Sequence, residues 1–163
     1  MEKLKQIIDN ALAWTVIVVM AVLVIDVLWQ VFTRFVLRDP SSFTEELARY
    51  LMIWVGLLGA SYAAGKRMHL AVDLLPMKMT GRRKHYLALV IEGFTLVFAV
   101  FALIIGGTRL VWTMLFLGQT SAALQIPIGY VYLAVPLSGL LIAFYAIVFI
   151  TEQLQALREM PSG

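Results

Sequence analysis

The sequence predicts an all-α integral membrane protein with four transmembrane helices. Of its 163 residues, 61% are hydrophobic and only 14% are charged, and the mean hydropathy is +0.88. A soluble domain of this size cannot bury so much apolar surface, so lipid must solvate much of the chain. Four apolar segments lie at about residues 11–37, 47–65, 86–116 and 128–151. We therefore expect residues 1–163 to form a single four-helix transmembrane domain, with short amphipathic helices at the membrane surface in its loops.

The first segment resembles a signal sequence because Lys3 and Lys5 precede an apolar run. That run continues past Asp26 to Val36 without a small-x-small cleavage site. The pattern therefore predicts a retained first transmembrane helix rather than a cleaved leader.

The second segment has the length of a single membrane crossing. Its 19 residues, 47–65, extend about 28 Å at 1.5 Å per residue, close to the thickness of the hydrocarbon core. Arg49 lies one turn inside this span, where it can reach the interface or pair with Glu45. We expect the other segments to pack around this helix.

Small residues recur along one side of the second segment. Gly56, Ala60 and Ala64 repeat every four residues, and Gly59 and Ala63 lie beside them. In lipid, close backbone approach across small residues is a main source of helix association. We predict a helix–helix contact here; the alternative is that small residues are simply common in membrane helices.

The third and fourth segments differ from a simple crossing. The third exceeds the ~20 residues that a span needs, so it must tilt or protrude. Pro136 lies inside the fourth segment and should kink it, and Ser138 could satisfy backbone groups that the proline frees. Residues 68–79 suit a short helix lying on the membrane surface.

The basic residues indicate which side each connection faces. The two ends and the 66–84 connection hold nine of them: Lys3, Lys5, Lys66, Arg67, Lys78, Arg82, Arg83, Lys84 and Arg158. The other side holds four: Arg34, Arg38, Arg49 and Arg109. Positive residues concentrate on the cytoplasmic side, so both termini are predicted to be cytoplasmic. Lys66, Arg67, Arg82, Arg83 and Lys84 would then set the topology and contact lipid headgroups.

A polar stripe follows the first helix. Asp26, Gln30, Arg34 and Arg38 repeat every four residues, from mid-membrane to the outer edge. An acid at this depth costs several kcal/mol if it faces lipid, so Asp26 should face protein or water. One interpretation is a proton or ion relay. We favour the other, a structural polar seam in which Asp26 pairs with an arginine or a hydroxyl of another helix or subunit.

Two adjacent acids, Glu45 and Glu46, open the second helix. Ser42 or Thr44 can cap this helix, and carboxylates in the first turn suit the positive end of the helix dipole. Capping alone would account for both acids; a role in contacting a partner is the equal alternative.

The sequence contains no recognisable catalytic or metal site. The two histidines are sixteen residues apart without companion ligands, and there is no cysteine. Glycine-rich nucleotide loops, nucleophile elbows and paired catalytic carboxylates are also missing. We expect neither enzymatic activity nor a cofactor, and no nucleic acid is expected as a partner, because the basic residues lie in short turns between apolar runs.

Three blocks of sequence stand out together. They are Glu45-Glu46-Leu47-Ala48-Arg49-Tyr50 with Trp54 and Gly59-Ala60; His69-Leu70-Ala71-Val72-Asp73-Leu74-Leu75; and Ile126-Pro127-Ile128-Gly129 with Tyr132 and Pro136. With these blocks the chain resembles a known family, the small membrane (DctQ-type) subunits of tripartite ATP-independent periplasmic (TRAP) transporters. Each block alone is a weak signal, but their order and spacing together are more specific. The resemblance covers about residues 10–152. The chain departs from many relatives at Phe43-Thr44, where those carry Trp-Ser.

The resemblance implies a division of labour in the bacterial inner membrane. A periplasmic binding protein captures an organic acid, such as sialic acid or a C4-dicarboxylate, and a large permease subunit moves it by an elevator motion. A sodium or proton gradient drives this uptake, and the small subunit extends the static scaffold. On this resemblance the residues that contact the large subunit are Asp26, Gln30, Gly56, Gly59, Ala60 and Ala63. Those that dock the binding protein or shape the rim are Arg34, Arg38, Glu45, Glu46 and Arg49.

Two other classes of membrane protein remain as alternatives. A stand-alone four-helix drug/proton antiporter would carry a glutamate inside its first helix, whereas the acid here is Asp26. A haem-binding anchor of a redox complex would need histidine pairs inside helices, and we expect neither His69 nor His85 within a span.

Overall fold

The computed structural model describes residues 2–39, 41–66 and 82–159. In this part of the chain, four helical runs are long and apolar enough to cross a membrane, and they cover Lys3–Leu37, Ser42–Gly65, Arg82–Phe116 and Ile128–Arg158. The predicted all-α membrane fold is therefore confirmed. The surface helix that we expected over 68–79 lies outside the described residues.

Each helical run extends beyond the predicted span. The first comprises α1 (Glu2–Phe32) and a π-helical end, η1 (Thr33–Leu37), and the second is α2 (Ser42–Gly65). The third comprises α4 (Arg82–Phe98), the π-helical η2 (Ala99–Gly106) and α5 (Gly107–Phe116), and the fourth comprises α6 (Ile128–Tyr132) and α7 (Ala134–Glu159). The first and third runs have 35 residues each, about 52 Å of helix, so they protrude from a core about 30 Å thick. His85, which we expected in a connection, consequently lies in the first turn of α4.

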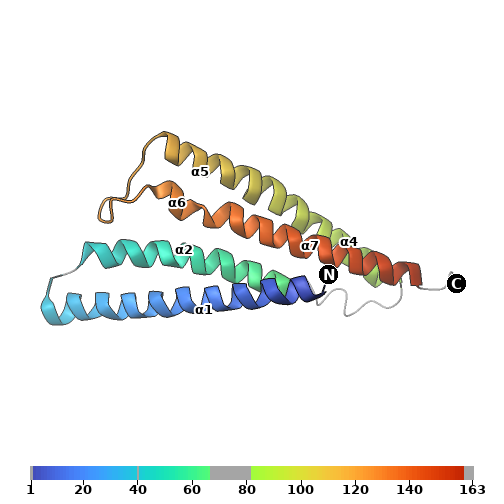
Figure 1. Ribbon diagram of the computed structural model, residues 1–163, viewed down its shortest axis with the longest axis horizontal. Helices are drawn as coiled ribbons and strands as arrows, with labels where there is room; N and C mark the ends of the chain where they lie inside the picture. The colour runs from blue at the N-terminus through green and yellow to red at the C-terminus, as the bar shows by residue number, and fades with distance from the viewer. Residues whose placement is uncertain (1, 40, 67–81, 160–163) are drawn as a thin grey trace.

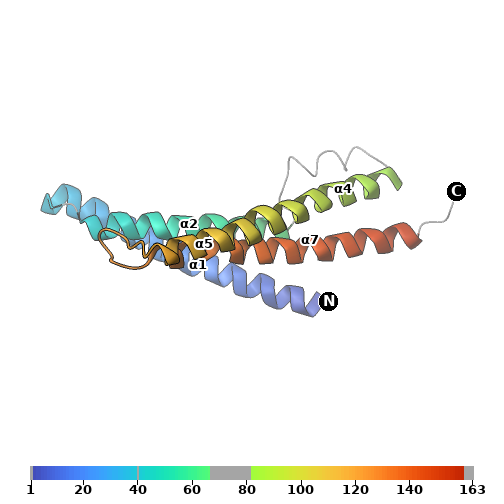
Figure 2. The ribbon, with the colours of Figure 1, turned by 90° about the horizontal axis from the view of Figure 1, so that it is seen from above.

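The helices form an open layer with one small apolar core, in which Leu12 of α1, Leu58 of α2 and Tyr145 and Phe149 of α7 pack together. α1 packs on α2, α2 packs on α7, and α7 packs on α4 and η2. Figure 1 shows this order across the layer, and Figure 2 shows the same layer from above. The start of α1 and the end of α7 lie toward one end of the layer, which we call the terminal end. The end of η1, the start of α2 and the 117–127 connection lie at the opposite end, the loop end.

The fourth run is the centre of the layer. In its most apolar stretch 44% of the residues are buried, compared with 17% for the second run and 6% for the third. The expectation that the other segments pack around the second helix was therefore wrong. α7 takes the central place because small residues let its neighbours approach: a Cβ added to Gly139 would lie 2.7 Å from the Leu103 Cβ of η2.

The predicted interruption of the fourth helix lies at Leu133, between α6 and α7. Pro136 follows three residues later and has no N–H with which to bond the carbonyl of Tyr132. The Ser138 hydroxyl donates to the Val135 carbonyl at 2.8 Å, so it serves a different backbone group from the one that the proline frees. The Ser138 carbonyl in turn accepts a bond of 3.3 Å from the fully buried Ser61 hydroxyl of α2.

Candidate functional site

The carboxylate of Glu46 connects α2 to the 117–127 connection at the loop end. Its Oε2 accepts hydrogen bonds from the backbone N–H of Ala123 at 2.7 Å, the N–H of Leu124 at 2.9 Å and the hydroxyl of Ser121 at 3.2 Å. Its Oε1 accepts from the Tyr50 hydroxyl at 2.8 Å and from the N–H of Ala122 at 3.2 Å. We call these groups the Glu46 cluster.

The shape of the connection explains why it needs this carboxylate. Gly118 has φ +61° and Gln125 has φ +55°, so the backbone adopts the left-handed conformation on both sides of segment 119–124. The N–H of Ser121 donates to the Ile126 carbonyl, and that of Ile128 donates to the Gln119 carbonyl, both at 2.9 Å. Successive N–H groups between these bonds point inward as an anion-binding nest, and Glu46 supplies the anion.

The two adjacent acids therefore have different surroundings. Glu45 lies in the first turn of α2, and its side chain is 65% exposed; it pairs with the equally exposed Arg49 at 3.5 Å. The residue that caps α2 is Ser41, which accepts from the N–H of Thr44, and not Ser42 or Thr44 as expected. Capping thus does not account for Glu46, whose role within this chain is to hold the connection.

The polar stripe of the first helix changes character along its length. Asp26 is buried, Gln30 is half-buried, and Arg34 and Arg38 are exposed at the loop end. Asp26 is 8% exposed, and its buried Oδ2 has no hydrogen-bond partner in the described part of the chain. The expected pairing of Asp26 with an arginine or a hydroxyl is therefore not formed within these residues. A buried acid without a partner carries a desolvation cost, so Asp26 does not stabilise the described part of the chain.

The small residues of α2 divide between two faces. Ser61, Ala64 and Gly65 are buried within the chain, whereas Gly56 and Ala60 are exposed. Gly59 and Ala63 are half-buried, and a Cβ added to Gly56 or Gly59 would meet nothing within 4 Å. Within the described residues, the Gly56 and Ala60 part of the face predicted for a helix–helix contact is thus open, whereas Ala64 is covered by the chain itself.

A second polar cluster, which we did not predict, lies at the terminal end. The Tyr145 hydroxyl of α7 donates to Asp9 Oδ1 at 2.6 Å, and Lys66 Nζ donates to Asp9 Oδ2 at 2.9 Å. This Asp9 cluster joins α1, α2 and α7, and the bond to Asp9 together with its negative charge raises the pKa of Lys66. Asp9 shares a helical stripe with Leu12 and Val16 of the apolar core, a signal that could have identified it.

Gly65 is the residue of α2 against which the Tyr145 ring of the Asp9 cluster packs. A Cβ at this residue would lie 2.6 to 2.8 Å from three ring atoms of Tyr145. Tyr145 is 1% exposed and packs with Leu12, Leu58 and Phe149. The absence of a side chain at Gly65 is therefore what lets the tyrosine reach Asp9.

The other basic residues predicted to set the topology lie at the terminal end wherever the structure describes them. Arg82, Arg83 and Lys84 are exposed in the first turn of α4, and Arg67 lies outside the described residues. His85 Nδ1 lies 2.6 Å from Gln153 Oε1, a contact between α4 and α7. Among the described residues, no group of three or more histidines and acids could hold a metal ion.

We expect the two buried acids to respond oppositely to replacement by leucine. Asp26→Leu removes a carboxyl without a partner and should leave the melting temperature of the purified chain in detergent unchanged or raise it. Asp9→Leu should lower it, because a buried hydroxyl left unpaired at Tyr145 costs about 1–3 kcal/mol. A fall in melting temperature for Asp26→Leu equal to that for Asp9→Leu would show that Asp26 does have a partner.

Comparison with known proteins gives the family. Residues 23–156 match the family described as tripartite ATP-independent periplasmic transporters, DctQ component. The chain belongs to the DctQ family. The resemblance that the three sequence blocks indicated is thereby confirmed, and the family consists of transporter components rather than enzymes.

Several relatives of this DctQ-family chain have assigned names. It is 32% identical over 92 residues to the sialic acid TRAP transporter small permease protein SiaQ of Vibrio cholerae, a match covering 56% of the chain and 53% of that protein. It is 29% identical over 143 residues to a putative TRAP transporter small permease protein of Haemophilus influenzae, covering 88% of the chain and 87% of the relative. It is 28% identical over 101 residues to the C4-dicarboxylate TRAP transporter small permease protein DctQ of Rhodobacter capsulatus, covering 61% and 44%.

A fourth match is to a protein of another kind. Over 46 residues the chain is 41% identical to the sialic acid TRAP transporter permease protein SiaT of Haemophilus influenzae. This stretch is 28% of the chain but only 8% of SiaT, so a DctQ-like segment occurs within a much longer permease polypeptide.

Proposed function

We propose that this chain is the small permease subunit of a TRAP transporter that takes up an organic acid such as sialic acid or a C4-dicarboxylate. A sodium or proton gradient drives the uptake. The other two components are a large permease subunit in the same membrane and a periplasmic substrate-binding protein. The names of the DctQ-family relatives support this assignment.

The open layer of helices is the observation that carries the proposal. A chain that crosses a membrane four times as an open layer has two broad faces, and many of its large apolar side chains are exposed on them. Phe94, Trp112 and Phe116 are each more than 70% exposed, as expected of residues that face lipid or another membrane protein. Such a layer suits a part that extends a scaffold, because it offers a long surface for contact with another membrane protein.

The open small-residue face of α2 supports contact with the large subunit. Gly56 and Ala60 leave room for a neighbouring backbone, and nothing in the described chain fills that room. The match to a segment of the longer SiaT permease also supports this association, because in that protein a DctQ-like stretch and the rest of the permease share one polypeptide. Gln30 of α1, and Gly59 and Ala63 of α2, complete the proposed surface. Asp26, which we also expected there, is buried within this chain.

The loop end is the proposed docking surface for the binding protein. Arg34, Arg38 and the Glu45–Arg49 pair are exposed there and offer charges of both signs. Glu46 contributes indirectly, because it fixes the 117–127 connection beside them. On this proposal the loop end faces the periplasm and both termini face the cytoplasm of a bacterial inner membrane, an orientation that the distribution of basic residues supports.

Co-purification and uptake test the proposal together. An affinity tag on this chain should recover a large permease polypeptide from mild detergent, and proteoliposomes should accumulate a carboxylate only when that polypeptide and a binding protein are both present. Proteoliposomes that contain this chain alone are the control. Proton-coupled export of drugs by the chain alone would favour the antiporter alternative, and recovery of the chain as a lone monomer would contradict the proposal.

A further inference from the structure

A polar pocket lies between α1, α2 and α7 at the terminal end, and we call it the terminal pocket. Among the described residues its lining consists of Lys5 and Asp9 of α1, Gly65 and Lys66 at the end of α2, and Phe149 and Glu152 of α7. The pocket has a volume of about 240 Å³. Two ammonium groups and two carboxylates therefore meet in one hollow, contributed by three helical segments.

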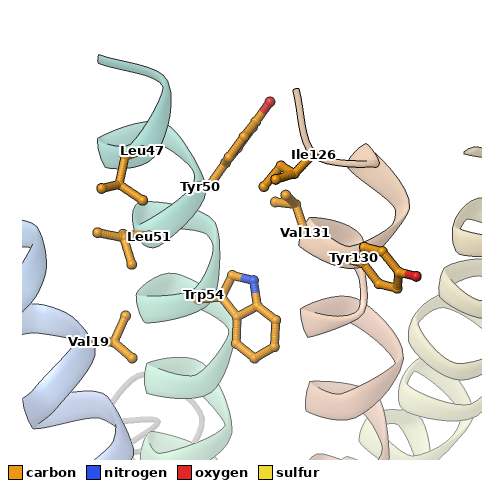
Figure 3. A pocket seen from close by; sticks show the side chains of 8 residues that line it. All are labelled: Val19, Leu47, Tyr50, Leu51, Trp54, Ile126, Tyr130 and Val131. Carbon is orange, nitrogen blue, oxygen red and sulfur yellow. The ribbon is translucent and has the colours of Figure 1, made fainter. Parts of the chain in front are cut away.

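The chemistry of the terminal pocket differs from that of an apolar trough near the loop end. Leu51 and Trp54 of α2 line that trough together with Ile126 and Val131, as Figure 3 shows. Its lining is almost entirely apolar, so nothing in it distinguishes one apolar occupant from another. A few charged groups at fixed positions, as in the terminal pocket, can instead select a ligand by its charge and its hydrogen bonds.

The two lysines provide hydrogen-bond donors for an anionic group. Lys66 Nζ donates to Asp9 Oδ2 at 2.9 Å, and an ammonium group has three N–H donors, so this bond leaves others available. Lys5 Nζ lies 4.5 Å from the centroid of the Phe149 ring, a cation–π contact that holds the ammonium group beside the pocket. A phosphate group matches this pair, because its charge is negative and its oxygens accept hydrogen bonds.

The two carboxylates differ in what they can offer a ligand. Both oxygens of Asp9 accept bonds within the chain, from the Tyr145 hydroxyl and from Lys66, and the Asp9 side chain is only 9% exposed. Glu152 is exposed, so it is the acid that a ligand can reach. Because this carboxylate repels an anion and accepts hydrogen bonds from an amine, the preferred ligand should carry an amine beside its phosphate.

The depth of the terminal pocket indicates where such a ligand comes from. α2 has 24 residues, about 36 Å of helix, so it exceeds a hydrocarbon core about 30 Å thick by only a few ångströms at each end. Gly65 and Lys66 therefore lie at the level of the lipid headgroups in the leaflet at the terminal end. Phosphate and amine occur together in this layer as the headgroups of zwitterionic phospholipids.

We propose that the terminal pocket binds the headgroup of a phospholipid of the phosphatidylethanolamine type. Lys5 and Lys66 bind the phosphate, and Glu152 accepts a hydrogen bond from the ammonium group. At roughly 30 Å³ per water-sized group, the pocket holds about eight such groups, enough for a phosphoethanolamine group. The bound headgroup connects α1, α2 and α7 beside the Asp9 cluster. The proposal holds whichever acid is transported.

Competition between phospholipids tests which headgroup is bound. The purified full-length chain is given equal amounts of phosphatidylethanolamine, phosphatidylcholine and phosphatidylglycerol with the same acyl chains, and native mass spectrometry measures the lipid retained. We expect several-fold more phosphatidylethanolamine than either competitor, because choline has no N–H donor and the glycerol headgroup has no amine. Equal retention of all three would indicate ordinary solvation by lipid, and a preference for phosphatidylglycerol would indicate attraction to basic residues alone; either result would overturn the proposal.

Two lysine variants locate the site. Lys5→Gln should reduce the retention of phosphatidylethanolamine several-fold. Lys3→Gln is the matched control, because it removes the same charge from the same helix, but Lys3 is exposed and does not line the pocket. Neither lysine takes part in the hydrogen bonds of Asp9, so both variants should keep the wild-type melting temperature. Equal loss of retention in both variants would refute the proposed site.

Two further measurements separate the headgroup from a free anion. Glu152→Ala should lower the retention of phosphatidylethanolamine to that of phosphatidylcholine, since the acceptor for the ammonium group is lost. Glycerophosphoethanolamine, a soluble headgroup, should raise the melting temperature of the delipidated chain, whereas inorganic phosphate at the same concentration should not. An equal rise with inorganic phosphate would show that the pocket binds a free anion, and an unchanged lipid preference in Glu152→Ala would show that Glu152 does not select the amine; each would contradict the proposal.

Discussion

Replacing Glu46 by alanine should release the 117–127 connection while leaving the four helices in place. The variant loses the acceptor of three backbone N–H groups and of two hydroxyls, and the connection contains no other anion. We expect amide hydrogen exchange at Ala122, Ala123 and Leu124 to accelerate by roughly tenfold or more, since unbonded exposed amides lose their protection. Uptake by the reconstituted transporter should also decrease, because the proposed docking surface loses its shape.

Glu45→Ala is the matched control for this prediction. Glu45 precedes Glu46 in sequence and carries the same charge, but its described contact is an exposed ion pair with Arg49, and such pairs contribute little to stability. Exchange in the 122–124 segment should stay at the wild-type rate. Equal acceleration in both variants would show that the net charge of the loop end, and not the hydrogen bonds of Glu46, orders the connection.

Replacing Gly65 by valine should strongly destabilise the isolated chain. The new Cβ would lie less than 3 Å from the Tyr145 ring, which is packed between α1, α2 and α7 and cannot move without breaking its bond to Asp9. Overpacking of this kind costs about 1–3 kcal/mol, and the loss of the bond adds to it. The thermal unfolding midpoint in detergent should therefore fall by several degrees.

Gly56→Val gives the opposite expectation on the same helix. A Cβ at Gly56 meets nothing within 4 Å, so the isolated chain should unfold at the wild-type temperature. Recovery of the large subunit by co-purification should nevertheless fall, because the valine side chain occupies the face of α2 that we propose the large subunit covers. If Gly56→Val destabilised the isolated chain as much as Gly65→Val, the packing described for α2 would be incorrect.

The sequence was sufficient for the fold class because hydropathy alone identifies apolar helices of this length. The family also followed from the three blocks, and the match over residues 23–156 confirms it. The central position of α7 could not be predicted. It depends on which helix each small residue faces, and apolar helices lack the periodicity that would reveal this.

The site was predictable only in part. The sequence located the acids at the start of the second helix, but Glu45 and Glu46 are chemically identical and differ only in direction around the helix. That Glu46 points toward Ser121–Leu124 depends on a contact between segments 75 residues apart or more. The Asp9 cluster was missed for the same reason, since Asp9 and Tyr145 are 136 residues apart.

Crosslinking from Ala60 most directly tests whether this chain is covered by a larger membrane protein. The chain has no cysteine, so Ala60→Cys provides a unique attachment point for a photoreactive probe on the open face of α2. In native membranes we predict a covalent adduct with the large permease polypeptide. Adducts with lipid alone, in membranes that contain the large permease, would contradict the proposed role as a scaffold subunit.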